Sequence, residues 1–353
     1  MTRLVRVIHV FGKKKKKDVD GPHKAGHDEL VVGDDEMTTK VFIDGEAGTT
    51  GLQIRARLEG RDDLDFISLG EEKRKDAGAR KEALNEADIV ILCLPDEAAK
   101  EGVSLIGNAT TRVIDASTAH RVADGWVYGF PEMSPGQRQA ISGATRITNP
   151  GCYPTGAIAL TRPLVAAGIV PQDWPLTVNA VSGYSGGGKQ MIAEFEDEAA
   201  PNYTLEAFRA YALGLAHKHV PEMQKNMGLA HPPLFAPNVG RYAQGMIVEV
   251  PLQLWALPGE VSVARVHETL EAYYEGQRFV SVAPLEESAA MTKLDPEQLN
   301  GTNEMKLFVF GNEKTKQVRL TGLLDNLGKG ASGQAVQCLN IMIGADEGLG
   351  VDL

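Results

Sequence analysis

The chain has 353 residues, 43% of them hydrophobic, and 36 lysines and arginines stand against 47 aspartates and glutamates, for a formal charge of −11. Three cysteines are too few for a disulfide-stapled secreted module, and the apolar content is too high for a disordered chain. The acidic balance argues against a nucleic-acid partner, and no run of about 18 apolar residues could span a membrane. We therefore expect a cytoplasmic protein of two domains, with no nucleic-acid or membrane partner.

The first 36 residues differ in composition from the rest. A short apolar run leads into five consecutive lysines, and the segment ends on two aspartates and a glutamate. Eight basic residues are balanced by seven acidic ones, which favours a disordered or appended tail over a basic arm for nucleic acid or anionic membrane. The order of apolar and basic residues disfavours a signal peptide, and the acidic residues disfavour a transit peptide. We expect the folded part to begin near Met37.

A strand pattern over 40–44 is followed by three glycines and then by an amphipathic helical pattern, LQIRARLEG. In this context glycines let the backbone approach a pyrophosphate, which sits on the helix N-terminus. The spacing is G-x-x-G-x-x-G, so a glycine turn without a ligand is the alternative. A strand over 64–69, a helix near 78–86 and an apolar strand over 88–95 favour a parallel sheet of the Rossmann type. The residues expected to bind the dinucleotide are Gly45, Gly48, Thr49, Thr50 and Gly51.

The end of the second strand bears on the choice of cofactor. An acidic residue that binds the ribose 2′-OH of NAD is expected there, but the chain has Ser68, two glutamates and then Lys73, Arg74 and Lys75. Ser68 can bond a 2′-phosphate and the basic triplet can neutralise it, which favours NADP over NAD. The alternative is a solvated loop, whose glutamates would repel phosphate.

Cys152 lies in NPGCYPT (149–155), directly before the apolar helical pattern AIALTRPLVAAG. A thiol at a helix N-terminus meets free N–H groups and the positive end of the helix dipole. These favour the thiolate and can stabilise an oxyanion. Cys93 lies in an apolar strand and Cys338 in an apolar helical pattern, so both are expected in the core. Cys152 is therefore the candidate nucleophile.

His217 and His219, in HKHVPE (217–222), are the candidate acid or base for this thiol. They follow a predicted helix over 202–214, so a surface pair that caps the C-terminus of that helix is the alternative. No Asp, Glu or Cys lies at the usual ligand spacing from them, so we expect no metal site. The spacing does not decide which of the two histidines acts.

Three further segments are candidates for supporting roles. Arg121 follows a strand-like segment and could grip two oxygens of a phosphate or carboxylate, or be an ordinary surface arginine. SGYSGGGK begins at Ser182 and Gly183, and its glycines favour a substrate-enclosing loop over a flexible hairpin. Several β patterns between 176 and 325 predict an antiparallel-leaning sheet. The apolar helix after Asn326 is expected in the core.

Together these motifs resemble the N-acetyl-γ-glutamyl-phosphate reductases, and specifically their shorter second type, over residues 37–353. The segment that starts at Asp115 ends in Thr-Ala-His-Arg, where the longer first type usually has Asp-Phe-Arg. Single matches would be weak, whereas seven in this order are specific. They are the glycine loop (45–51), DASTAHR (115–121), YGFPE (128–132), NPGCYPT, SGYSGGGK, HKHVPE and LLDNLGKGASGQAVQ (323–337).

The resemblance implies an NADPH-dependent reduction of N-acetyl-γ-glutamyl phosphate to N-acetylglutamate 5-semialdehyde, in arginine biosynthesis, through a thioester on Cys152. It implies an α/β fold of the semialdehyde dehydrogenase type: a Rossmann-type NADP-binding domain (37–151 and 328–353) and an α+β catalytic and oligomerisation domain (152–327). A homo-oligomer, dimer or tetramer, is implied as well. The resemblance places Asn326 beside the nicotinamide. By analogy with a His-Ser-Glu element in related dehydrogenases it favours His219 as the acid.

Three other functions stay open at this stage. The nearest is an acyl-phosphate reductase of the same superfamily, of the aspartate-semialdehyde or lysine-pathway type, against which NPGCYPT and HKHVPE argue. A cofactor-free cysteine hydrolase would leave the glycine loop and the basic triplet unexplained. A non-catalytic NADP-binding regulator would not need Cys152 and both histidines intact.

Overall fold

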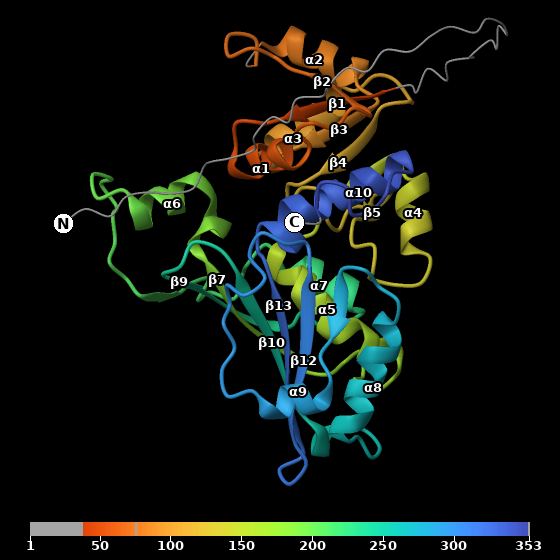
Figure 1. Ribbon diagram of the computed structural model, residues 1–353, viewed down its shortest axis with the longest axis vertical. Helices are drawn as coiled ribbons and strands as arrows, with labels where there is room; N and C mark the ends of the chain where they lie inside the picture. Colours follow the sequence, from red (N-terminus) through yellow and green to blue (C-terminus); the bar gives the residue numbers. More distant parts are fainter. Residues whose placement is uncertain (1–37, 75, 352–353) are drawn as a thin grey trace, which may run out of the picture. The chain divides into compact units, whose positions relative to one another are not determined.

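Two β-sheets organise the computed structural model, which describes residues 38–74 and 76–351 (Figure 1). The tail expected over 1–36 lies outside the described residues, and so does Lys75 of the basic triplet. No helix in the described ranges is long and apolar enough to cross a membrane.

The first sheet has six parallel strands in the order β2-β1-β3-β4-β6-β5, as the Rossmann-type prediction requires. All four residues of β3 are buried, because apolar clusters cover both faces of the sheet. The helix expected near 78–86 is present, and the two expected strands are shorter than predicted. The strands are β1 (Thr39–Asp44), β2 (Leu64–Ile67), β3 (Ile89–Leu92), β4 (Arg112–Asp115), β5 (Val127–Tyr128) and β6 (Arg146–Thr148), and the helices are α1 (Thr49–Arg57), α2 (Ala77–Glu86), α3 (Asp96–Leu105), α4 (Gln137–Gly143) and the C-terminal α10 (Gly333–Ile343).

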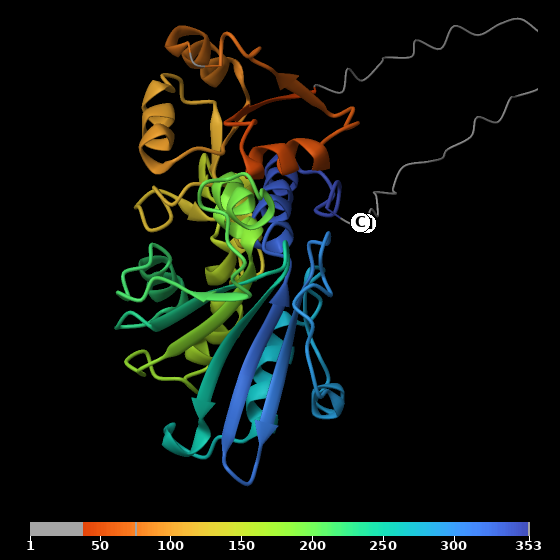
Figure 2. The same ribbon diagram turned by 90° about the vertical axis from the view of Figure 1, so that its left-hand side faces the viewer.

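The second sheet has seven strands in the order β11-β12-β13-β10-β7-β9-β8. Four of its pairings are antiparallel and two are parallel, so the antiparallel-leaning prediction is confirmed. In Figure 2 the long strands β12 and β13 lie side by side in blue, with α8 in cyan behind them. The strands are β7 (Thr177–Gly183), β8 (Phe208–Ala210), β9 (Leu234–Gly240), β10 (Met246–Gln253), β11 (Val280–Val282), β12 (Met305–Asn312) and β13 (Gln317–Leu324), and the helices are α5 (Cys152–Ala166), α6 (Gly188–Glu196), α7 (Val220–Met227), α8 (Val263–Tyr274) and α9 (Leu285–Ala290).

The helix predicted over 202–214 is absent, so that prediction is wrong. The segment instead forms β8, which pairs antiparallel with β9 at the sheet edge. Pairing with an existing sheet satisfies the backbone directly, whereas helix propensity over a dozen residues is weak. A helix does begin at the histidines: His219 is the N-cap of α7, and Pro221 is in its first turn, where a missing N–H is tolerated. The alternative that the histidines cap a helix C-terminus is therefore wrong too.

A buried ion pair holds the turn at Gly328–Ser332, just before α10 returns the chain to the first sheet. Lys329 Nζ lies 2.8 Å from Glu132 Oε2 and 2.7 Å from Gln337 Oε1, and both charged side chains are fully buried. Burial lowers the pKa of Lys329, and the Glu132 carboxylate offsets this only in part. Each charge is tolerated in the interior only because the other is present.

Replacing Lys329 with methionine is expected to lower the free energy of unfolding by about 3–5 kcal/mol, because Glu132 is left buried without a counter-charge. Urea unfolding of the full chain measures this change. The double variant Lys329→Met/Glu132→Met is expected to recover most of the loss.

Lys306→Met is the matched control, since Lys306 pairs with Glu287 at 2.7 Å but both side chains are more than a third exposed. Its cost should stay below about 1 kcal/mol. If Lys329→Met costs no more than Lys306→Met, the stabilising role of the buried pair is contradicted.

Candidate active site

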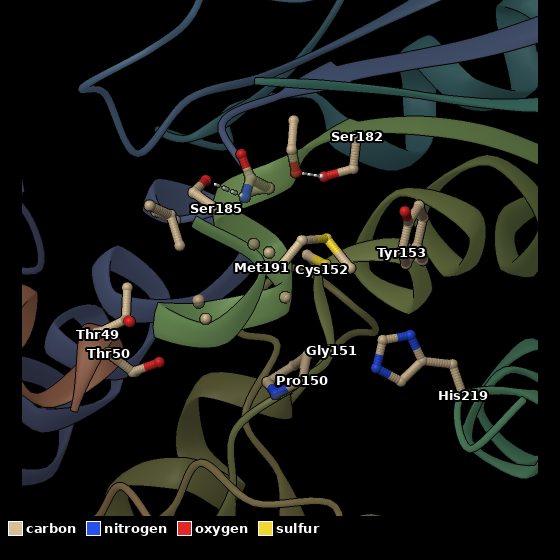
Figure 3. A pocket seen from close by; sticks show the side chains of 18 of the residues that line it. Thr49, Thr50, Pro150, Gly151, Cys152, Tyr153, Ser182, Ser185, Met191 and His219 are labelled. Atoms are coloured by element: carbon tan, nitrogen blue, oxygen red, sulfur yellow. Dashed lines mark hydrogen bonds between the residues drawn. The ribbon is translucent and has the colours of Figure 1, made fainter. Parts of the chain in front are cut away.

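A cavity of about 390 Å³ opens at the carboxyl ends of β1, β4 and β6, where segments of the second sheet meet the first (Figure 3). Ligands of open parallel sheets bind at this edge, where loops and helix N-termini converge. The sequence motifs, far apart in the chain, come together here. The predicted site residues that line the cavity are Thr49, Thr50, Arg121, Cys152, Ser182, Gly183, His217, His219 and Asn326.

Cys152 is the first residue of α5, with Gly151 as its N-cap. The thiol is closely surrounded: a Cβ placed on Gly330 would lie 2.8 Å from Cys152 Cβ, so a side chain at position 330 would displace it. Cys93 and Cys338 lie in the apolar cluster that includes α10 and the first sheet, as predicted for core cysteines. Only Cys152 of the three lines the cavity.

The protonation state of Cys152 differs from the expectation. Burial raises the pKa of the thiol to about 11, although the Tyr153 N–H and the Arg121 charge both lower it. In the free protein this shift favours the thiol over the thiolate expected at the helix N-terminus, because desolvation outweighs the backbone N–H groups and Arg121. A reaction at this sulfur needs a neighbouring base to take the proton.

His219 is placed to be that base. Its side chain is buried, and a Cβ on Gly151 would lie 2.6 Å from Nε2, so the ring fits beside the cysteine loop only because residue 151 is glycine. Figure 3 shows His219 across from Gly151 and Cys152. Burial, and then the charge of Arg121, hold the pKa of His219 well below its usual value. Its Nδ1 has no hydrogen-bond partner among the described residues. The ring is neutral at pH 7 and can accept a proton.

His217 holds a different position. Its Nδ1 accepts a hydrogen bond from the backbone N–H of His219 at 3.1 Å, and burial lowers the pKa of His217 to about 4. The ring also packs edge-on against Tyr211 and Phe235. Since Nδ1 is occupied as an acceptor, the neutral ring carries its proton on Nε2. His217 therefore supports the start of α7, which carries His219.

Glu222 is a site residue that the sequence reasoning missed. It lies one turn after His219 on α7, and its fully buried carboxylate accepts hydrogen bonds from the Gly151 N–H at 2.8 Å, Tyr128 Oη at 2.7 Å and Arg121 Nη1 at 3.0 Å. One side chain thereby joins the N-terminus of α5 to α7. The helical period in HKHVPE, which puts residues 219 and 222 on one face, is the signal that could have identified it.

Arg121 is held by the protein on three sides. Besides Glu222, it donates to the backbone oxygens of Asn149 at 3.0 Å and Ala116 at 3.3 Å, and its side chain is only 9% exposed. The alternative of an ordinary surface arginine is therefore wrong. The guanidinium lines the cavity, and its remaining N–H groups can meet an anion there.

The glycine loop folds as a close turn. Gly45 has φ +90°, and a Cβ there would lie 2.4 Å from the Cys93 carbonyl oxygen, while a Cβ on Gly51 would lie 2.6 Å from Gly45 O. Only glycine fits at either position. The turn delivers the chain to α1, whose first N–H groups lack intrahelical partners and can bind phosphate. The loop therefore fits a dinucleotide pyrophosphate.

The residues expected at a 2′-phosphate separate in the structure. Arg74 lines a second cavity of about 300 Å³ with Gly45, Leu69 and Leu94, and its nearest ion-pair contact is 4.0 Å away on Glu71. The side chains of Ser68 and Lys73 are exposed and do not line this cavity. Of Ser68, Lys73 and Arg74, the structure therefore brings Arg74 alone to the cavity beside Gly45.

The SGYSGGGK segment is not a hairpin. It leaves β7 through a 3₁₀ turn at Tyr184–Gly187 and enters α6, with Ser182 and Gly183 on the cavity wall. Asn326 is fully buried and joins this turn to the neighbouring loop, since its Oδ1 accepts from the Gly245 N–H at 2.7 Å and its Nδ2 donates to Ser185 Oγ at 3.0 Å. The segment therefore encloses one side of the cavity.

Comparison with known proteins shows a family match for each of the two sheet-containing parts of the chain. Residues 59–143 match the family model described as semialdehyde dehydrogenase, NAD binding domain, and residues 152–326 match semialdehyde dehydrogenase, dimerisation domain. The N-acetyl-gamma-glutamyl-phosphate reductase 2 of Nostoc sp. is 53% identical over 318 residues, covering 88% of this chain and 99% of that protein. The N-acetyl-gamma-glutamyl-phosphate reductase of Brucella anthropi is 57% identical over 309 residues, covering 87% and 99%.

Among solved structures, aspartate semialdehyde dehydrogenase II from Vibrio cholerae, complexed with ASA, superposes with a TM-score of 0.64 at 15% identity. The match covers 87% of this chain and 98% of that one. At this identity the likeness concerns the fold alone. The predicted fold of the semialdehyde dehydrogenase type is confirmed.

The raised pKa of Cys152 predicts how the free protein reacts with iodoacetamide. Because only the thiolate is alkylated, the rate at Cys152 should rise roughly tenfold per pH unit from about pH 7 to about pH 10. Mass spectrometry of the modified peptide follows the reaction, and Cys152→Ser gives the background from the other two cysteines. A rate that levels off below about pH 8 would show a preformed thiolate and contradict the assignment.

Proposed function

Because this chain belongs to the N-acetyl-γ-glutamyl-phosphate reductase family, we propose that it reduces N-acetyl-γ-glutamyl phosphate to N-acetylglutamate 5-semialdehyde and phosphate in arginine biosynthesis. NADPH, when bound, supplies the hydride. The observation that carries the proposal is the placement of Cys152 and His219 in one cavity, whose other end is the glycine loop at the start of α1.

Cys152 is the nucleophile of the first half of the reaction. Its sulfur attacks the acyl phosphate carbon, the bond from that carbon to the phosphate oxygen breaks, and a thioester remains on the enzyme. His219 takes the thiol proton during the attack, a role supported by its neutral ring and by its place beside Gly151. The N–H groups at the start of α5 face the oxyanion that develops on the carbonyl.

His219 also acts in the second half. Once the bound cofactor had supplied its hydride, a tetrahedral oxyanion would remain on Cys152; as that oxyanion collapses to the aldehyde the carbon–sulfur bond breaks, and His219 returns its proton to the leaving sulfur. An imidazolium buried next to Arg121 gives up its proton readily. The opposite pKa shifts of Cys152 and His219 keep the thiol protonated and the ring unprotonated in the free protein, and they make proton transfer between the two unfavourable until attack on the substrate consumes the thiolate.

The cofactor is NADP. Gly45, Gly48 and Gly51 bring the backbone close to the pyrophosphate, which the N–H groups of Thr49 and Thr50 bind. Arg74 neutralises the 2′-phosphate, supported by its place in the cavity beside Gly45. Ser68 and Lys73 would act there only after moving toward that cavity.

The substrate occupies the end of the cavity nearer the second sheet. Arg121 binds its phosphate or carboxylate through the N–H groups that the protein leaves free. Ser182 and Gly183 would enclose it from the end of β7, and Asn326, which holds the enclosing turn, would lie beside the nicotinamide when the cofactor is bound.

We further propose that residues 37–151 and 328–353 form the NADP-binding domain and residues 152–327 the catalytic and oligomerisation domain. Support comes from α10, which packs against α1 and α4 of the first sheet although it follows the second sheet in the chain. The match of 152–326 to a dimerisation domain supports a homo-oligomer, dimer or tetramer. The enzyme works in the cytoplasm, where such a biosynthetic step takes place.

The reverse reaction tests this function directly. Purified protein with N-acetylglutamate 5-semialdehyde, phosphate or arsenate, and NADP⁺ should produce the absorbance of the reduced nicotinamide. Cys152→Ser should lower the rate at least about a thousandfold, because no thioester can form.

The same assay is run in parallel with aspartate semialdehyde as the aldehyde and with NAD⁺ as the cofactor. If the wild type reacts with aspartate semialdehyde but not with the acetylated aldehyde, the proposed substrate is wrong. If NAD⁺ gives a catalytic efficiency equal to that of NADP⁺, the role of Arg74 is wrong. Full activity of Cys152→Ser would exclude the thioester.

The two histidines should differ when each is replaced by asparagine. His219→Asn is expected to lower kcat by about a hundredfold to ten-thousandfold, because it removes the proton relay. His217→Asn keeps a side chain that can accept the His219 N–H, so its kcat should fall much less. Steady-state rates of both variants measure this, and a larger loss in His217→Asn would reverse the assignment.

A further inference from the structure

Four large apolar side chains are exposed on one short segment, residues 205–215. The exposed fractions are 75% for Leu205, 58% for Phe208, 80% for Leu213 and 59% for Leu215. These are four of the nine exposed large hydrophobic side chains in the described part of the chain. Single exposed leucines are ordinary, but such a concentration in one segment marks an interaction surface.

The segment lies at an edge of the second sheet. Within it, β8 pairs with β9 on one side and ends the strand order on the other. Arg209, in the middle of β8, forms ion pairs with Glu194 at 2.8 Å and Glu206 at 2.5 Å. Its neighbours in the strand, Phe208 and Ala210, are exposed. An edge strand with apolar residues on its open face is a site where another chain can add.

The turn after β8 is strained as well as exposed. Ala212 and Leu215 have φ of +53° and +58°, and the Leu215 N–H donates to Ala212 O at 3.0 Å, which closes a turn around Leu213. They are two of the three non-glycine residues with positive φ in the described ranges. Such a conformation persists when surrounding structure holds it, yet this turn presents its leucines to solvent.

The same turn joins two residues of the active-site wall. Tyr211 precedes it and His217 follows it, both line the cavity, and their ring centroids are 5.7 Å apart. His217 in turn holds the backbone of His219. Whatever covers the turn therefore also steadies the wall beside the proton relay.

We propose that segment 205–215 docks on the same segment of a second copy of this chain, and that this contact holds Tyr211 and His217 in their working positions. The inference rests on the homo-oligomer of the proposed function. The segment lies inside the part that matches a dimerisation domain, and a two-fold contact places like residues against each other.

Charge supports a second copy as the occupant. Each chain carries a formal charge of −11, so two copies repel over most of their surfaces. Segment 205–215 is an exception, since its only charged residues, Glu206 and Arg209, pair with each other. Docking there buries apolar surface without leaving a charge unpaired.

Sedimentation of the full chain, run beside the reductase assay, tests the proposal. The wild type should have a multiple of the 38.0 kDa chain mass, and Leu205→Glu/Leu213→Glu should shift toward 38.0 kDa. Its kcat/KM should fall about tenfold, because the wall that carries His217 is displaced. The control Trp255→Glu changes a side chain that is 69% exposed on a different segment, and it should keep both the mass and the rate.

Hydrogen exchange of the wild type provides a test without substitution: amides of 205–215 should lose protection when the protein is diluted until it dissociates.

A double variant that keeps the wild-type mass, or a fully active wild type of 38.0 kDa, overturns the proposal. If the wild type is inactive on the acetylated aldehyde while the double variant still dissociates, docking is supported and the proposed reaction is contradicted. An unchanged far-ultraviolet circular dichroism spectrum of the double variant separates dissociation from misfolding, because dissociation alone is expected to lower the unfolding temperature.

Discussion

The buried carboxylate of Glu222 is the contact on which the site geometry depends. Cys152 and His219 begin two different helices, and nothing in the local chain sets the distance between them. Glu222 bonds the Gly151 N–H from within α7, so the two helix N-termini are fixed together. A charge buried this deeply requires a partner, and Arg121 provides it while it also brings a positive charge to the cavity.

Burial then sets the chemistry of the two reacting groups in opposite directions. It raises the pKa of the Cys152 thiol and lowers the pKa of His219, so the thiol keeps its proton and the imidazole stays free to receive it. The positive charge of Arg121 lowers both pKa values, but it is the smaller effect on each. The thiol and the imidazole are thus both uncharged in the free protein.

The cavity depends equally on how the chain returns to the first sheet. Gly330 packs against Cys152, and the neighbouring Lys329 is held by Glu132 inside the protein. Asn326, a few residues earlier, holds the enclosing turn of SGYSGGGK. Residues 326–330 therefore support Cys152 and the cavity wall at once, which explains why so short a segment contains two fully buried polar side chains, Asn326 and Lys329.

The sequence by itself determined the glycine loop, the parallel sheet, the candidate nucleophile among three cysteines and the family, because these follow from local patterns and ordered motifs. Only the tertiary structure decided that residues 208–210 form a strand, that Arg74 rather than Ser68 or Lys73 lies by the glycine loop, and that Glu222 belongs to the site. It also decided that Cys152 rests as a thiol. Sheet pairing, burial and desolvation depend on residues far apart in the chain, so no local pattern could reveal them.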